Sequence, residues 1–417
     1  MAKILITSLG VGLAGKNNLV EREYRKATYE IDGIKYSPRS FIASVLNEHL
    51  KLDGIIFLGT VKSMWEEVYN SFCTEKEIKL DDQYYYELDE KISNLNYTSS
   101  LDTLDLKPLE KILGDRSKCI LMKYGITEQE LQENLDRTIQ IIDYLKNGDE
   151  LYIDITHSFR SLSLFLFLIL TFLNDLVSDR DIKIKGIYYG MVEAAGELKY
   201  APIVNLQSLF DLTQWIKGAY SLKEFGNGYL IANLLEQQGQ GEIAKDIRNL
   251  SDAININYVP TIQERAKDLK AKLKQEQPSP FKYLQGILDR FVKKFAEKHH
   301  SGARECDFQL ELAEWYFEKK RYATGYITLA EAIITYLCEI HDEDFKDKNN
   351  RDKMKDLLYE NRNSSLSQLY CKKIDSIRNA IAHASFDKQR TSYTQAINKT
   401  DDYIKELKEI FKTGRLV

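Results

Sequence analysis

The chain has 417 residues, of which 43% are hydrophobic and 29% charged, and its formal net charge is -5. This length is enough for two or three domains, and the composition is ordinary for a folded globular protein, which excludes wholesale disorder. The slightly acidic balance excludes a general attraction to nucleic acid or anionic lipid, so any nucleic-acid contact must be a local patch.

The cysteines, the N-terminus and the one strongly apolar run indicate the cellular compartment. The 5 cysteines lie far apart and form no CxxC or Cys/His spacing, which predicts reduced thiols and no zinc or other metal site. The N-terminus has neither a basic segment nor a cleavage site of small residues, so we expect a cytoplasmic protein. The apolar run LSLFLFLILTFL from Leu162 is shorter than a membrane span and predicts a buried helix.

Up to about residue 205, short apolar runs alternate with helical segments, a pattern typical of a parallel-sheet α/β domain. The predicted strands are KILITS, GIIFLG, CILMKY, ELYIDI and IKGIYYG. Between the first two strands, Asp32 and Gly33 separate two aromatic-rich runs, as in a tight hairpin. The predicted helices cover residues 38–50, 62–72, 128–146 and 159–176.

After Pro202 the sequence has helical periodicity and no convincing strand, so we expect the remainder to be all-α. Residues 211–250 fit two helices that are broken at Gly226-Asn227-Gly228, and the proline-containing residues 275–280 fit a connector. A helical block runs from about Ser301 to the C-terminus, with FKDKNNRDKMKD as a charged loop. The prediction is an α/β Rossmann-like domain (1–205), a helical connector (206–300) and an all-α domain (301–417).

Gly10, Gly12 and Gly15 follow the first strand in the order G-x-G-x-x-G, which is found in dinucleotide sites. Such a site also needs a helix after the third glycine and an acidic residue at the end of the second strand. This chain has a predicted hairpin instead of the helix, and GIIFLGT ends without Asp or Glu. An NAD-dependent Rossmann enzyme is therefore a minor alternative. The glycines indicate either a close ligand approach or simply a tight strand exit.

A second polar turn follows the fourth strand, in YIDITHSFRS. Its polar residues are Asp154, Thr156, His157, Ser158, Arg160 and Ser161. Ser158 is a plausible N-cap, and the amide groups of the following helical turn favour a phosphate or a similar acceptor. In open α/β sheets, ligands bind at the carboxyl ends of the strands, so TSLGVG and DITHSFRS are predicted to share one crevice. The alternative is a capped helix whose histidine is merely hydrogen-bonded.

DITHSFRS closely resembles the D-x-T-H-G signature of CRISPR-associated CARF proteins, the sensor domains of type III CRISPR systems, and TSLG resembles that family's first ligand loop. Ser158 stands where the family usually has Gly. The resemblance implies that two CARF domains pair around one cyclic oligoadenylate, with cyclic tetra-adenylate as the default ring. The implied ligand-binding residues are Ser8, Leu9, Gly10, Asp154, Thr156, His157, Ser158, Arg160 and Ser161.

Near the C-terminus, Arg378 and His383 form an R-x-x-x-x-H motif in a helical pattern. At helical spacing, Ile377, Ala380, Ile381 and Ala384 form an apolar stripe, and Arg378, Asn379, Ala382 and His383 occupy the opposite arc. The small Ala382 would leave a shallow floor on which a phosphate could rest. A solvated helix face is the alternative interpretation of this arc.

With the amphipathic helices of ELAEWYFEKKRYATGYITLAEAIITYLCEI, this motif resembles the HEPN ribonuclease fold over about residues 301–412. The resemblance implies that Arg and His of two protomers meet and cut single-stranded RNA without a metal or cofactor. Arg378 would bind the scissile phosphate, His383 would transfer protons near neutral pH, and Asn379 would bind phosphate or orient one of them. The expected product is a 2′,3′-cyclic phosphate.

The two resemblances together imply an endoribonuclease of CRISPR antiviral defence that cyclic oligoadenylate activates. It would work as a homodimer or as an assembly of dimers. The sequence does not decide whether the sensor also cleaves its cyclic oligoadenylate slowly. The alternative is a ligand-responsive regulator that binds RNA or a partner and does not cleave.

Overall fold

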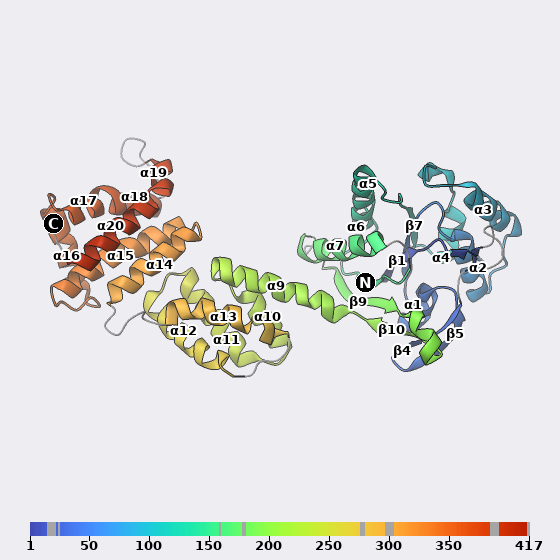
Figure 1. The fold of residues 1–417 in the computed structure, drawn as a ribbon, viewed down its shortest axis with the longest axis horizontal. Coiled ribbons are helices and arrows are strands. Elements are labelled where there is room, and N and C mark those ends of the chain that lie inside the picture. Colours follow the sequence, from blue (N-terminus) through green and yellow to red (C-terminus); the bar gives the residue numbers. More distant parts are fainter. Residues whose placement is uncertain are drawn as a thin grey trace. The chain divides into compact units, whose positions relative to one another are not determined.

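The computed structural model of the chain describes residues 1–14, 22–23, 26–157, 160–176, 181–275, 280–296, 304–383 and 392–414. The chain divides into two compact units, Met1–Thr213 and Gln214–Val417 (Figure 1). Among the described residues, no helix is both long and apolar enough to cross a membrane.

A mixed 8-stranded sheet forms the centre of the first unit, in the order β5-β4-β10-β9-β8-β1-β6-β7. Its strands are β1 (Lys3–Leu9), β4 (Ala27–Ile31), β5 (Ile34–Arg39), β6 (Gly54–Gly59), β7 (Lys118–Leu121), β8 (Glu150–Asp154), β9 (Lys183–Gly190) and β10 (Ala201–Asn205), and a separate small sheet pairs β2 (Leu13–Ala14) with β3 (Arg22–Glu23). The strands from β7 to β9 are parallel, whereas β10 is antiparallel to β9 and β5 to β4. The predicted α/β Rossmann-like class is confirmed, with a mixed edge beyond β9.

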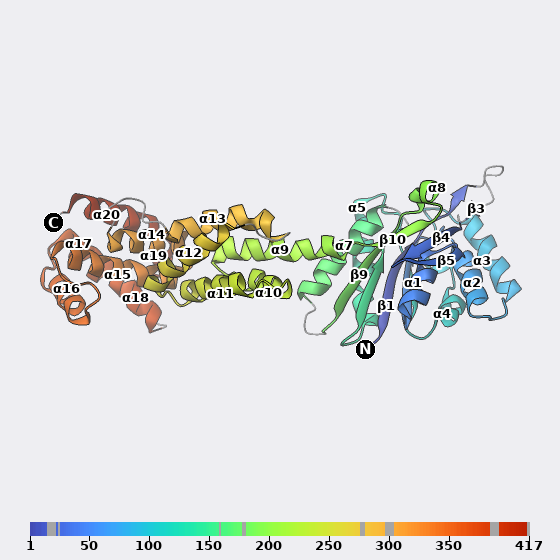
Figure 2. The ribbon, with the colours of Figure 1, turned by 90° about the horizontal axis from the view of Figure 1, so that it is seen from below.

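Helices cover both faces of this sheet (Figure 2). One side carries α1 (Ile42–Leu50), α2 (Trp65–Glu75), α3 (Asp82–Asn94) and α4 (Lys107–Leu113), and the other carries α5 (Glu128–Ile139), α6 (Ile141–Tyr144) and α7 (Arg160–Leu176). Leu5 of β1 belongs to the core under α1 and α2, whereas Ile4 and Ile6 belong to the core under α5 and α7. Burial on both faces explains why the central strands are continuous apolar runs.

Most predicted elements of this unit are confirmed, with shifted ends. The third predicted strand ends at Leu121 rather than Tyr124. The helix predicted over residues 128–146 is divided at Gln140 into α5 and α6. The helices α3, α4 and α8 (Ala195–Leu198) were not predicted, because they have few buried apolar positions from which a period can be read.

The hairpin and the last strand gave opposite outcomes. The hairpin is confirmed, because Asp32 and Gly33 have φ angles of 51° and 77° between β4 and β5, as a two-residue hairpin turn requires. The prediction of no strand beyond Pro202 is wrong, because β10 continues to Asn205. This short strand lies between β9 and β4, so its pairing partners specify it more than its own residue pattern does.

The helix α7 corrects the prediction of a buried apolar helix. Leu166, Ile169 and Leu170 are buried in the sheet core, but Leu164 is 68% and Leu168 60% exposed. The run is apolar around the helix, so its pattern does not reveal which face meets the sheet. Within the part of the chain that the structure describes, the side of α7 with Leu164 and Leu168 is therefore exposed.

The second unit contains only helices among its described residues, as predicted. α9 (Gln207–Phe225) begins in the first unit and is followed by α10 (Tyr229–Gln237), α11 (Gly241–Asn255), α12 (Val259–Leu273) and α13 (Phe281–Ala296). The C-terminal helices are α14 (Glu305–Glu318), α15 (Tyr322–Ile340), α16 (Lys348–Glu360), α17 (Ser365–Leu369), the π-helical turn η4 (Tyr370–Ile374), α18 (Asp375–Ala382), α19 (Tyr393–Asn398) and α20 (Thr400–Thr413).

Two details of this unit differ from the prediction. The helix break at Gly226 is confirmed, but Gly239, with a φ of 76°, ends α10 and makes a second break, so residues 211–250 contain parts of three helices. The charged segment predicted as a loop is largely α16. Its buried apolar residues Met354 and Leu358 are 2% exposed and lie one helical turn apart, and the charged residues around them obscure this short pattern. Residues 276–279 of the predicted connector lie outside the described residues.

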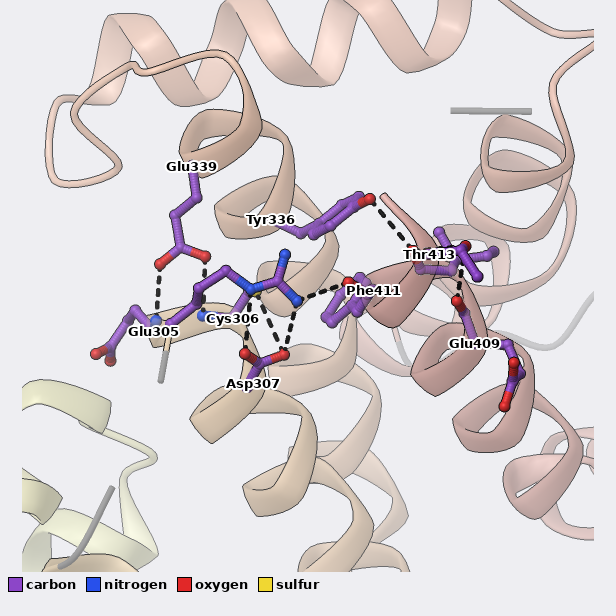
Figure 3. Close-up of polar contacts among 10 residues, drawn as sticks. Glu305, Cys306, Asp307, Tyr336, Glu339, Glu409, Phe411 and Thr413 are labelled. Atoms are coloured by element: carbon purple, nitrogen blue, oxygen red, sulfur yellow. Dashed lines mark hydrogen bonds and ion pairs between the residues drawn. The ribbon is translucent and has the colours of Figure 1, made fainter. Parts of the chain in front are cut away.

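A polar cluster joins α20 to the start of α14 (Figure 3). The Arg304 guanidinium donates to the Asp307 carboxylate at 3.0 and 3.1 Å and to the carbonyl oxygen of Phe411 at 2.8 Å. The Glu339 carboxylate accepts from the first amide of α14, Glu305 N, at 2.7 Å. The ring of Phe411 stacks on Tyr336 with centroids 4.3 Å apart. The donors and acceptors of this cluster pair with one another, and these contacts attach the C-terminal helix to the helical core.

Candidate functional site

The first edge turn (residues 8–12) and the second edge turn (residues 154–157) are neighbours because β1 and β8 are adjacent parallel strands. Thr7 is opposite Asp154 in the strand register, and its hydroxyl donates to Asp154 Oδ2 at 2.7 Å. Ser8 Oγ donates to the carbonyl oxygen of His157. Side-chain hydrogen bonds thus join the two turns at the carboxyl edge of the sheet.

We call the Asp154 side chain the brace of this edge, because it is buried and accepts the hydrogen bonds that hold the turn. Its side chain is fully buried, and its Oδ1 accepts from Thr156 N at 2.9 Å. Burial raises the pKa of Asp154, while His157 and the hydrogen bonds from Thr156 and Thr7 act in the opposite direction. Burial and the nearby Asp154 charge also raise the pKa of Tyr29, which places that phenol beside the brace. The carboxylate therefore holds the turn and does not face solvent.

Thr156 and His157 connect the second edge turn to its surroundings. The Thr156 hydroxyl accepts from Gly190 N at 2.8 Å, which attaches the turn to the end of β9. The His157 ring meets Phe41 edge-on, with centroids 6.4 Å apart, and its Nε2 is shielded from solvent. Burial lowers the pKa of His157, and the Asp154 charge opposes this shift. The imidazole is therefore neutral at neutral pH.

A third loop, between β6 and α2, holds the first edge turn, and the sequence analysis did not find it. Ser63 Oγ donates to the carbonyl oxygen of Leu9 at 2.8 Å, and Met64 N donates to that of Gly10 at 3.1 Å. Gly12 has a φ of 76°, a conformation that favours glycine and redirects the chain after the turn. The available signal was the polar segment TVKS directly after the strand GIIFLG.

The structure separates the predicted ligand-binding residues into two groups. Ser8, Leu9 and Asp154 are buried. Gly10, Thr156 and His157 are partly exposed at the edge. Arg160 and Ser161 occupy the first turn of α7, and Ser158 lies outside the described residues.

The predicted catalytic residues lie at the end of α18. Arg378 Nη2 donates to Asn379 Oδ1 at 2.9 Å, and His383 follows the last residue of the helix, with its N–H bonded to the carbonyl of Asn379 at 3.0 Å. Asn379, Ala382 and His383 are exposed, and Arg378 is partly so, whereas Ile377 is 3% exposed. The described residues of the predicted polar arc therefore share the outer side of α18.

Two further residues belong to this cluster, and the sequence analysis did not find them. The buried Asp375 carboxylate is 2.5 Å from Arg378 Nη2 and accepts from Asn379 Nδ2 at 3.0 Å. The hydroxyl of Tyr359, on α16, donates to Asp375 at 2.5 Å. An acidic residue three positions before Arg378 on one helix was a readable signal for the first contact. The contact from α16 had no signal in the sequence.

Two family models match parts of this chain. The family model for the CARF domain of CRISPR system endoribonuclease Csx1 matches residues 4–193, and the model for the second domain of CRISPR-associated protein MJ1674 matches residues 211–301. The CRISPR-associated protein MJ1674 of Methanocaldococcus jannaschii is 36% identical over 435 residues, which cover 98% of this chain and 66% of that protein. The chain thus spans about two thirds of the length of this relative.

A solved structure is also similar along most of its length. It is Enterococcus italicus Csm6 bound to cyclic hexa-2'-fluoro-hexa-dAMP, and the match covers 99% of this chain and 94% of that chain. The sequence identity is 12% and the TM-score 0.37.

Proposed function

Because the chain belongs to the CRISPR-associated CARF proteins, we propose that its first unit senses a cyclic oligoadenylate and that its C-terminal helices form an endoribonuclease that this ligand activates. The observation that carries the proposal is the pair of joined edge turns within the CARF match, at the place where open α/β sheets bind ligands. The partly exposed Arg378 on α18 and the exposed His383 directly after this helix support the nuclease half.

The two groups of sensor residues have different roles in this proposal. Ser8 and Asp154, which are buried, keep the two edge turns in register. Gly10, Thr156 and His157 border the ligand. Arg160 is the first residue of α7. A positively charged residue type and a helix N-terminus each favour the phosphates of a cyclic oligoadenylate. Cyclic tetra-adenylate is the ring that we expect first.

The nuclease half needs no nucleophile of its own, because RNA supplies the 2′-OH. The 2′-oxygen attacks the adjacent phosphorus, the bond from phosphorus to the 5′-oxygen breaks, and the products are a 2′,3′-cyclic phosphate and a 5′-OH. Arg378 binds the phosphate and stabilises the charge that develops on it. His383 transfers the proton that leaves the 2′-OH and the one that the departing 5′-oxygen gains, since imidazole can both accept and donate near neutral pH. Each chain has one such pair, so a composite site of two copies provides both an acid and a base.

The uncovered apolar faces of the helices support a homodimer. Leu164 and Leu168 on α7 are more than half exposed, as are Leu209, Ile216 and Tyr220 on α9, at 58%, 57% and 61%. Large apolar side chains in such rows mark protein contacts. No charged residue occurs between Leu162 and Leu173, so two copies of α7 can pack without repulsion between like charges.

The test is cleavage of a single-stranded RNA by the full chain in the presence of the activating ring and a chelator, with analysis of the product ends. The wild type is expected to leave 2′,3′-cyclic phosphate ends, and His383→Ala is expected to bind RNA and to cut it at least about 100-fold more slowly. Full cleavage by His383→Ala removes the proposed chemistry. A wild type that binds RNA but cuts none with any ring establishes the non-cleaving regulator instead.

A further inference from the structure

The buried Asp375 carboxylate joins two helices directly beneath the proposed catalytic arginine. Asp375 is the first residue of α18 and is 2% exposed. Its Oδ2 accepts from Tyr359 of α16 at 2.5 Å and from Asn379 at 3.0 Å, and its Oδ1 lies 2.5 Å from Arg378 Nη2. A carboxylate with these partners is held in place from both helices.

Two tyrosines surround this carboxylate on its inner side. Burial and the hydrogen bond to Asp375 raise the pKa of Tyr359, so its hydroxyl remains a donor throughout the neutral range. Burial and the Asp375 charge also raise the pKa of Tyr370, whose ring meets that of Tyr359 edge-on at a centroid distance of 6.3 Å. The Asp375 carboxylate thus lies beside two buried tyrosine rings that contact each other.

The same contacts determine which part of Arg378 remains for a ligand. Nη2 is engaged by both Asp375 and Asn379, and Nε is shielded from solvent. The Nη1 group is what the guanidinium can offer to a phosphate oxygen. The Arg378 side chain is 22% exposed, so it reaches the surface while its inner edge is fixed. A long side chain without these contacts would have to lose its rotamer freedom when RNA binds.

We propose that Asp375 and Tyr359 are positioning residues of the ribonuclease site: they fix the Arg378 guanidinium, with Asn379 as a second contact, before RNA arrives. The inference rests on the proposed function. It adds that the orientation of the phosphate-binding arginine depends on α16 as well as on α18. Neither residue touches the RNA, and their effect on the reaction passes through Arg378.

The test compares Tyr359→Phe with the wild type in ring-activated RNA cleavage by the full chain, with kcat and KM determined separately. The variant removes only the hydroxyl and keeps the buried ring. We expect kcat to fall about 10-fold, as for the loss of a hydrogen bond to a charged group, and KM to rise, because the guanidinium must then be ordered when RNA binds. The melting temperature falls as well, since the buried carboxylate loses a donor. Asp375→Asn should lower kcat further, because it also removes the ion pair with Arg378.

Tyr336→Phe is the matched control, because it removes a hydroxyl that bonds to the carbonyl of Ile410 at 3.3 Å, away from α18. It should leave kcat unchanged. In an Arg378→Lys background, Tyr359→Phe should cost less than in the wild type, since the side chain that it positions is gone. Equal costs in both backgrounds, or a wild-type kcat in Tyr359→Phe, overturn the inference. A wild type without RNA cleavage contradicts the proposed function itself.

Discussion

Asp154 is the residue on which the geometry of the sensor edge depends. Its carboxylate accepts from the Thr7 hydroxyl and from Thr156 N, and it is fully buried. Asp154→Ala leaves the buried Thr7 hydroxyl and the partly buried Thr156 N without this acceptor, so we predict that the free energy of unfolding falls by about 2 kcal/mol. Asp154→Asn should lose less, because its amide oxygen still accepts one bond. Urea unfolding measured by circular dichroism tests this order, and an Ala variant as stable as the Asn variant contradicts it.

His157 predicts an acid dependence of the sensor unit. Burial lowers the pKa of its imidazole in the folded chain below the unfolded value of about 6.5. The unfolded chain therefore binds more protons on acidification. The stabilisation is complete above the unfolded value and is lost as the pH falls below it. We predict that between about pH 7 and pH 5 the melting temperature of the wild type falls more than that of His157→Gln. Parallel curves for the two proteins would refute this role.

At the scale of elements, the sequence predicts best where the pattern has one period and one buried face. The parallel strands were found because burial on both sides makes them continuous apolar runs. The helix α16 was missed because Met354 and Leu358 are its only buried apolar residues among many charges. The strand β10 was missed because its neighbours specify it.

The candidate site follows the same division. Arg378, Asn379 and His383 lie on one helical segment, so their common side could be derived from spacing alone. Asp375 was within the same reach. Tyr359 comes from another helix, and only the packing of α16 against α18 places its hydroxyl on the carboxylate. Spacing finds residues that share an element, and tertiary packing supplies the remainder.

The exposed face of α7 predicts a contact between two copies of this chain. Leu168 is 60% exposed, so replacing it by arginine costs the single chain little. If α7 packs against a second copy, Leu168→Arg buries a charge in an apolar contact. We predict that this variant shifts the protein from dimer to monomer in analytical ultracentrifugation.

Leu198→Arg is the control for this substitution, because Leu198 is an exposed leucine of the same unit, at 46%, on α8. It should leave the dimer intact. A dimer that persists in Leu168→Arg, at concentrations where the wild type is dimeric, assigns the contact to a different face.

Over the whole molecule, the proposed function requires that a ligand at the sheet edge controls chemistry on α18. Coupling of this kind requires that the ring binds the active arrangement of the protein better than the inactive one. A buried carboxylate lies beside the proposed functional residues of each unit: Asp154 at the edge turns and Asp375 at Arg378.

The most direct test is the initial rate at which the full chain cleaves a fluorogenic single-stranded RNA, in a chelator, with no ring and with cyclic tri-, tetra- and hexa-adenylate in turn. We predict background cleavage without a ring and a rate at least about 100-fold higher with one ring, with the tetramer expected first. A rate that is the same with and without every ring, whether high or at background, contradicts it.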